Sequence, residues 1–126
     1  MSEFGCDECW SSEASDAWKA VTSIPIEVYL IDESHYIVSV RACPSCSQRY
    51  LQVMTEIVDW KDGDDTIYRT IIPIDDAERA KLTTSKPLYT SVIEAVGAGR
   101  RSLKYGPRGQ DPITYWGTGV DVGPHD

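Results

Sequence analysis

The chain has 126 residues, of which 41% are hydrophobic and 25% are charged. This length fits one domain with a buried core, and its apolar runs are shorter than the roughly 20 residues that cross a membrane. The formal net charge is −8, from 12 basic and 20 acidic residues. This balance disfavours general nucleic-acid binding, because such binding depends on Lys and Arg neutralising phosphates.

The first residues contain neither the basic stretch nor the apolar stretch of a signal peptide. We therefore expect a cytoplasmic protein, in which thiols stay reduced and paired cysteines favour a metal over a disulfide. If the chain were exported by another route, two disulfides would be the leading alternative.

Three helices are expected to flank a sheet. The first has apolar residues at helical spacing, with Ser11 or Ser12 as its cap. The second begins at Asp75 or Asp76. The third has Ser85 as its cap, and Gly97 closes it. The apolar positions of the first and third helices are Ala14, Ala17, Trp18, Val21, Leu88, Val92, Ala95 and Val96.

Residues 25–74 predict four strands, because apolar and polar residues alternate between short turn signals. The strands are expected at 26–31, 36–42, 50–58 and 66–72. Short connections between successive strands favour an antiparallel meander. The fold class is therefore α+β. We expect a single domain over 1–105 and, because Gly and Pro are frequent beyond it, an irregular tail over 106–126.

All four cysteines lie in two Cys-x-x-Cys pairs, Cys6–Cys9 and Cys43–Cys46. Two thiolate pairs at this spacing can close a tetrahedral site around one zinc ion. A closed shell of four thiolates leaves no open position for water, so the expected Zn²⁺ is structural. Four thiolates also select iron, which remains the alternative metal. The second pair lies in the turn between two predicted strands, so the site is expected at one end of the sheet.

The segment Ala42-Cys43-Pro44-Ser45-Cys46-Ser47 resembles the knuckle of zinc ribbons and rubredoxins, in which Cys-Pro-x-Cys caps a β-hairpin. The resemblance covers these six residues and implies a metal-binding turn. Two features depart from it. Ser47 stands where the knuckle usually has glycine, and 33 residues separate Cys9 from Cys43, more than the roughly 15 to 20 of a simple ribbon.

The same Cys-Pro-x-Cys motif is similar to the active site of glutaredoxin-type proteins, which implies redox chemistry. That motif normally opens a helix within a βαβ unit. Here the residues after Cys46 alternate as a strand does, and no βαβ pattern precedes them. His35 is expected in an exposed turn and His125 in the tail, so no Cys-His or Ser-His-Asp arrangement can be assembled. We expect a protein that is not an enzyme.

These features favour an acidic zinc-binding protein that binds and inhibits a basic protein partner, such as a toxin or nuclease, in the manner of immunity proteins and antitoxins. This is an analogy of charge and size. The predicted contact surface combines an aromatic ring with carboxylates: Glu56, Asp59, Trp60, Asp62, Asp64 and Asp65.

Two alternatives remain open. The first is an accessory zinc-ribbon module that contacts nucleic acid through a local basic patch. Its residues would be Arg41, Arg49, Arg100, Arg101, Lys104 and Arg108. The second is a small redox or electron-transfer protein with an iron centre, which visible colour would distinguish from zinc.

Overall fold

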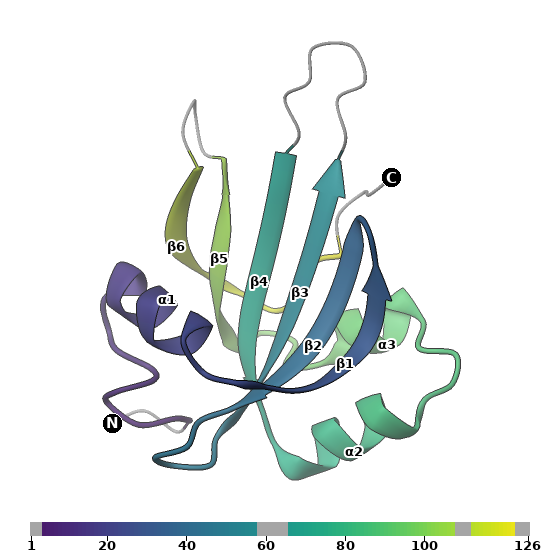
Figure 1. Cartoon of the computed structure of the whole chain (residues 1–126), viewed down its shortest axis with the longest axis horizontal. Coiled ribbons are helices and arrows are strands. Elements are labelled where there is room, and N and C mark those ends of the chain that lie inside the picture. Colours follow the sequence, from purple (N-terminus) through teal and green to yellow (C-terminus); the bar gives the residue numbers. More distant parts are fainter. Residues whose placement is uncertain (1–3, 58–65, 108–111, 123–126) are drawn as a thin grey trace.

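The structure, a computed structural model, describes residues 4–57, 66–107 and 112–122. Its centre is an antiparallel sheet of six strands that follow one another in chain order (Figure 1). The strands are β1 (Ile26–Glu33), β2 (Tyr36–Ala42), β3 (Arg49–Ile57), β4 (Thr66–Ile74), β5 (Arg101–Pro107) and β6 (Pro112–Thr118). The predicted meander and the α+β class are confirmed, but the prediction of four strands is wrong.

The two additional strands correct the prediction for the C-terminal residues. β5 runs through the predicted domain boundary at residue 105, and β6 occupies the middle of the segment expected to be irregular. The two strands pair without a bulge, from Arg101 opposite Thr118 to Pro107 opposite Pro112. Gly and Pro do not prevent this pairing, because Pro107 and Pro112 stand at the strand ends, where a missing N–H costs least.

Three helices accompany the sheet. These are α1 (Ala14–Thr22) before β1, and α2 (Asp76–Thr84) and α3 (Thr90–Ala95) between β4 and β5. The N-cap of α1 is Glu13, with no side-chain cap, so the caps predicted at Ser11 and Ser12 are wrong. The second helix begins as predicted, because the Asp75 carboxylate accepts the Glu78 N–H while the Glu78 side chain accepts the Asp75 N–H.

The predicted start of the third helix is also wrong. Ser85 ends α2 rather than capping α3, since its N–H and its hydroxyl both donate to the carbonyl of Lys81. α3 starts five residues later, after Tyr89 as N-cap. Gly97 follows it with a φ of 61°, a left-handed conformation that favours glycine.

The sheet is covered on both faces. α2 and α3 pack on one face, called here the α2/α3 face, and the N-terminal segment and α1 pack on the other, called the α1 face (Figure 1). The α2/α3 face is built mainly from aliphatic side chains: Tyr36, Val38, Val40, Leu51, Val53, Ile72, Ile74, Leu82, Ile93, Val96 and Val120. The α1 face combines aromatic, aliphatic and sulfur-containing residues: Cys9, Trp10, Ala17, Val21, Ile24, Cys43, Tyr50, Ile71 and Leu103. In the described ranges, no helix has the length and apolar character needed to cross a membrane.

Candidate metal centre

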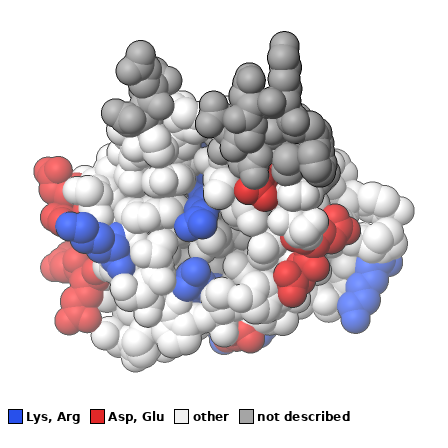
Figure 2. Space-filling model, turned by 45° about the horizontal axis from the view of Figure 1, so that its top comes forward, with Lys and Arg blue, Asp and Glu red and all other residues white. Residues whose placement is uncertain are grey.

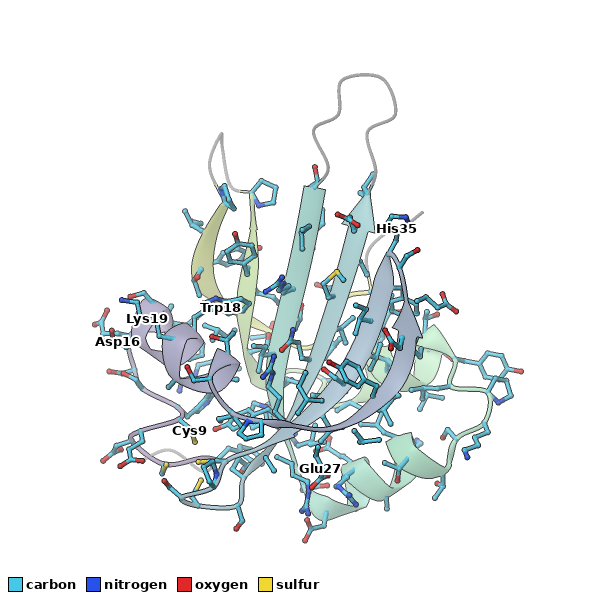
Figure 3. The ribbon with its side chains drawn as sticks, in the orientation of Figure 1. Cys9, Asp16, Trp18, Lys19, Glu27 and His35 are labelled. Atoms are coloured by element: carbon cyan, nitrogen blue, oxygen red, sulfur yellow. The ribbon has the colours of Figure 1, made fainter. Side chains whose placement is uncertain are left out.

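The four cysteines come together at one end of the sheet. Cys6 and Cys9 lie in the N-terminal segment before α1, and Cys43 and Cys46 lie in the turn between β2 and β3. All four Sγ atoms lie within 4.8 Å of one another, and the sulfur atoms gather beside the labelled Cys9 in Figure 3. The predicted clustering at the end of the sheet is confirmed, and the thiols are not joined as disulfides.

The spacing of the sulfurs fits a tetrahedral metal ion. The Sγ of Cys9 lies 3.5 Å from that of Cys6 and 3.7 Å from that of Cys46. A regular tetrahedron with metal–sulfur bonds of about 2.3 Å has sulfur–sulfur edges of about 3.8 Å. The four side chains can therefore hold one ion, with Cys9 and Cys43 buried and Cys46 exposed.

Each cysteine pair sits in a tight backbone turn. The Ser47 N–H donates to the Cys43 carbonyl at 2.8 Å, and the Trp10 N–H donates to the Cys6 carbonyl at the same distance. Ser47 has a φ of 66°. It adopts the left-handed conformation that glycine usually supplies in a knuckle, so the departure in sequence does not change the turn.

The sulfur of Cys9 has two polar neighbours. The Cys6 N–H donates to it at 3.3 Å, and the hydroxyl of the fully buried Tyr50 lies 3.0 Å away. Burial raises the pKa of Cys9 to about 12 and also raises the pKa of Tyr50. Backbone hydrogen bonding from Cys9 lowers the pKa of Cys6. A buried thiol of this kind becomes a thiolate when a cation replaces its proton, and the Tyr50 hydroxyl can then donate to it.

Further contacts hold the two turns together. The Gly5 N–H donates to Oε1 of Gln48 at 3.1 Å, and Nε2 of Gln48 donates to the Ile74 carbonyl at 2.9 Å. The Ser45 hydroxyl donates to a Glu8 carboxylate oxygen at 3.0 Å. Gln48 and Tyr50 support the centre, but the sequence did not predict this role. For Tyr50 the available signal was its place in β3, where it alternates with the aliphatic residues of the other face; Gln48 lies just before this strand and gave no such signal.

Aromatic rings cover the centre on the side of β5 and β6. Trp10 is buried, with its ring centroid 5.1 Å from that of Tyr50 and 5.0 Å from that of Trp116. Trp116 donates from Nε1 to the Ser12 carbonyl at 2.9 Å. Trp18 of α1 stacks on Tyr105 of β5, with ring centroids 5.1 Å apart.

The predicted partner surface lies mostly outside the described residues. Asp59, Trp60, Asp62, Asp64 and Asp65 belong to the 58–65 gap. Glu56 is the second-last residue of β3. Its side chain is 20% exposed, and its carboxylate contacts Nδ1 of His35 at 2.8 Å. Its acidic group is therefore engaged within the protein.

The predicted basic residues are also engaged internally. Arg49 pairs with Glu27 and Asp76, and Arg100 contacts Glu78 and the Pro73 carbonyl. Arg41 donates to Gln52 and to the Ile24 carbonyl. Arg101 lies over the ring of Trp116, and Arg108 falls outside the described ranges.

No protein-family model matches the chain, and no match was found among curated proteins or solved structures.

Proposed function

We propose that the four cysteines hold one Zn²⁺ ion and that the ion is structural. The observation that carries this proposal is the approach of all four Sγ atoms to within 4.8 Å of one another. Four thiolates satisfy the usual shell of structural zinc and leave no position for a substrate or an activated water. In the described residues, neither cysteine pair lies beside His35, which contacts Glu56 instead.

The ion would connect parts of the chain that are distant in sequence. Cys9 and Cys46 are 37 positions apart, and α1, β1 and β2 lie between them. A zinc ion that binds the native state and not the unfolded state adds its binding free energy to the stability of the fold. The proposed role is to fix the N-terminal segment and α1 against the sheet.

Native mass spectrometry of the reduced protein isolated from its host tests this proposal. One zinc per chain is expected, with a colourless solution. A Cys43→Ser variant should lose the metal, whereas Ser34→Ala, at an exposed position in the turn between β1 and β2, should keep it. Two disulfides without metal, or a visible iron absorption band, would overturn the assignment.

We further propose that the protein binds and inhibits a basic protein partner. Its support is the net charge of −8 and the exposure of acidic residues in the N-terminal part: Asp7, Glu8, Glu13 and Asp16. Acidic side chains gather on the side of the molecule where α1 lies (Figure 2). Such a field accelerates encounter with a partner of opposite charge. Inhibition would follow if the acidic protein covered a basic functional surface.

A nucleic-acid partner is the less favoured alternative. The guanidinium groups of Arg41, Arg49 and Arg100 donate hydrogen bonds to acceptors within the protein, whereas phosphate binding requires free cationic groups.

Partner capture from the host at low salt, followed by binding kinetics, tests the role. Association with the captured basic protein should slow as salt rises and should slow further in an Asp62→Lys/Asp64→Lys variant. An Asp7→Lys/Asp16→Lys variant serves as the comparison for the N-terminal acidic residues. Kinetics unchanged by salt and by both variants would exclude a charge-directed partner. Salt-sensitive binding to DNA or RNA would favour the alternative.

A further inference from the structure

A pocket of about 450 Å³ lies on the sheet at a distance from the cysteines. Its lining includes Ile57, Tyr68, Thr70, Lys104, Tyr115 and Asp121. Thr70 stands opposite Lys104, and Lys104 stands opposite Tyr115, so the three side chains share one face. Since Ile72 packs in the core of the α2/α3 face and Thr70 precedes it by two residues, the pocket opens on that face. Pockets of this size hold small molecules.

Lys104 brings a poorly compensated positive charge to this pocket. Its side chain is 11% exposed. The ammonium donates to the Gly119 carbonyl at 2.9 Å and to the Thr70 hydroxyl at 3.4 Å. Its acidic neighbour is Asp121, whose carboxylate is 3.8 Å away on a side chain that is 89% exposed. Burial lowers the pKa of Lys104, as expected for a charge that has lost water and whose carboxylate neighbour, within the part of the chain that the structure describes, is the exposed Asp121.

Two glycines shape the floor of the pocket. A Cβ atom on Gly117 would lie 3.0 Å from Cγ and 3.1 Å from Cε of Lys104, and one on Gly106 would lie 2.8 Å from Cδ1 of Tyr68. The lysine stem and the tyrosine ring therefore lie directly on the sheet backbone. This arrangement leaves the space above them open while holding the ammonium in place.

We propose that the pocket binds a small molecule with a flat aromatic ring and a carboxylate. The ring would pack against Tyr68 and Tyr115, which favour stacked or edge contacts with another ring. The carboxylate would contact Lys104, taking the role that the exposed Asp121 fills weakly.

Arg69 also lines the pocket, but it alternates with Thr70 along β4 and its guanidinium lies 5.9 Å from the ring centroid of Tyr105, its register partner. One buried ammonium on the face of Thr70 therefore suits a singly charged anion, because phosphate sites more often combine several cationic or backbone donors. This inference does not depend on the metal centre or on a protein partner.

The test uses two matched probes, naphthalene-2-carboxylate and the neutral naphthalene-2-carboxamide, titrated into the full-length metal-loaded protein. Amide ¹H–¹⁵N NMR spectra should show saturable shifts at Thr70, Lys104 and Gly117. The carboxylate should bind about tenfold more tightly than the carboxamide, because the ammonium then contacts a charged acceptor instead of a neutral one. Shifts elsewhere, equal affinities, or no saturation with either probe would overturn the proposal.

Three variants sharpen the test. Lys104→Met keeps the apolar stem and should abolish the preference for the carboxylate, whereas the exposed Lys19→Met on α1 (Figure 3) should leave it unchanged. Asp121→Asn removes the competing anion and should tighten carboxylate binding about threefold, as expected when an exposed pair is removed. Because Asp121 is exposed, Asp121→Asn should fold, and it tests the lysine contact even if Lys104→Met does not fold. Unchanged carboxylate affinity in Asp121→Asn would count against the lysine contact.

Discussion

The two faces of the sheet are closed by different chemistry. On the α2/α3 face, aliphatic side chains of the strands pack against Leu82 and Ile93 of the helices. On the α1 face, aromatic rings and thiols form a large part of the core. The buried residues of α1 itself are Ala17 and Val21. Ala14 and Trp18 of α1 are only partly buried, so the apolar area that α1 buries completely is small.

This difference indicates which parts of the fold need a ligand. Burial of aliphatic area stabilises the α2/α3 face without any other component. A nine-residue helix such as α1 is marginal on its own, and its hydrophobic attachment consists of two small buried side chains and the partly buried ring of Trp18 on Tyr105. A metal ion held by the four cysteines would strengthen this attachment, because it would tie the segment before α1 to the β2–β3 turn. The α1 face should therefore respond to metal, and the α2/α3 face should not.

Removal of the metal should produce the largest effect. We expect the free energy of unfolding to fall by on the order of 5 kcal/mol, less than the full binding energy of small zinc modules because the sheet retains its other core. Amides of α1 should lose hydrogen-exchange protection while those of β2 and β3 near Val38 and Val53 keep it. Hydrogen exchange and urea unfolding, with and without a chelator, measure both quantities.

The Cys43→Ser variant should reproduce the effect of the chelator, and Ser34→Ala, at an exposed position in the turn between β1 and β2, should not. Equal loss of protection on both faces would contradict the division of the fold proposed here.

Leu82→Ala should give the second largest effect, on the opposite face. Leu82 is 1% exposed in α2, and a Leu-to-Ala change at such a site costs about 3 kcal/mol through lost burial and the cavity left behind. Metal content by mass spectrometry should stay at one ion per chain. Leu82→Met nearly conserves volume and should cost less than about 1.5 kcal/mol. Loss of metal from folded Leu82→Ala would show that the two faces are coupled.

Tyr50→Phe should act on the metal centre alone. It removes the hydroxyl that lies 3.0 Å from the Cys9 sulfur but keeps the ring beside Trp10. Loss of such a supporting contact lowers metal affinity by about tenfold or more, and competition with a chromophoric chelator measures the change. Tyr89→Phe, on a side chain that is 63% exposed, is the matched control. Unchanged affinity in Tyr50→Phe would mean that the hydroxyl does not stabilise the thiolate.

The sequence predicted the metal centre better than its surroundings. Cysteine spacing is a local pattern, and the turn at Cys43–Cys46 follows from the strands on either side of it. By contrast, the contacts of Gln48 and Tyr50 depend on strand register and on the path of the N-terminal segment. Neither of these can be read from local spacing.

The fold shows the same contrast. The first four strands were predictable because each alternates apolar and polar residues, but β5 and β6 contain glycines that usually interrupt strands. Gly106 and Gly117 are compatible with the sheet because Tyr68 and Lys104 lie over them, a tertiary compensation with no local signature. The predicted cap of α3 was wrong for a related reason, since the Ser85 hydroxyl donates to the Lys81 carbonyl of the preceding helix.

The smallest predicted effect concerns Glu27, which ties β1 to the α2/α3 side. Its carboxylate accepts from Nε of Arg79 at 2.8 Å and from Nε of Arg49 at 3.1 Å. Burial alone would raise the pKa of Glu27, but the two guanidinium groups outweigh it and hold the pKa below the ordinary value of 4.5. Because the folded-state pKa is the lower one, this stabilisation is present above pH 4.5 and is lost as the pH falls through the folded-state pKa.

Glu27→Gln should therefore cost less than about 1 kcal/mol at pH 7, since the side chains are partly exposed, and the difference from wild type should vanish in acid. Urea unfolding of both proteins across this pH range measures it. Metal loss in acid affects both proteins alike and cancels in the difference. Glu13→Gln, at an exposed position before α1, provides the control. If the Glu27→Gln difference persisted at low pH, the contribution of Glu27 would come from packing rather than from its charge.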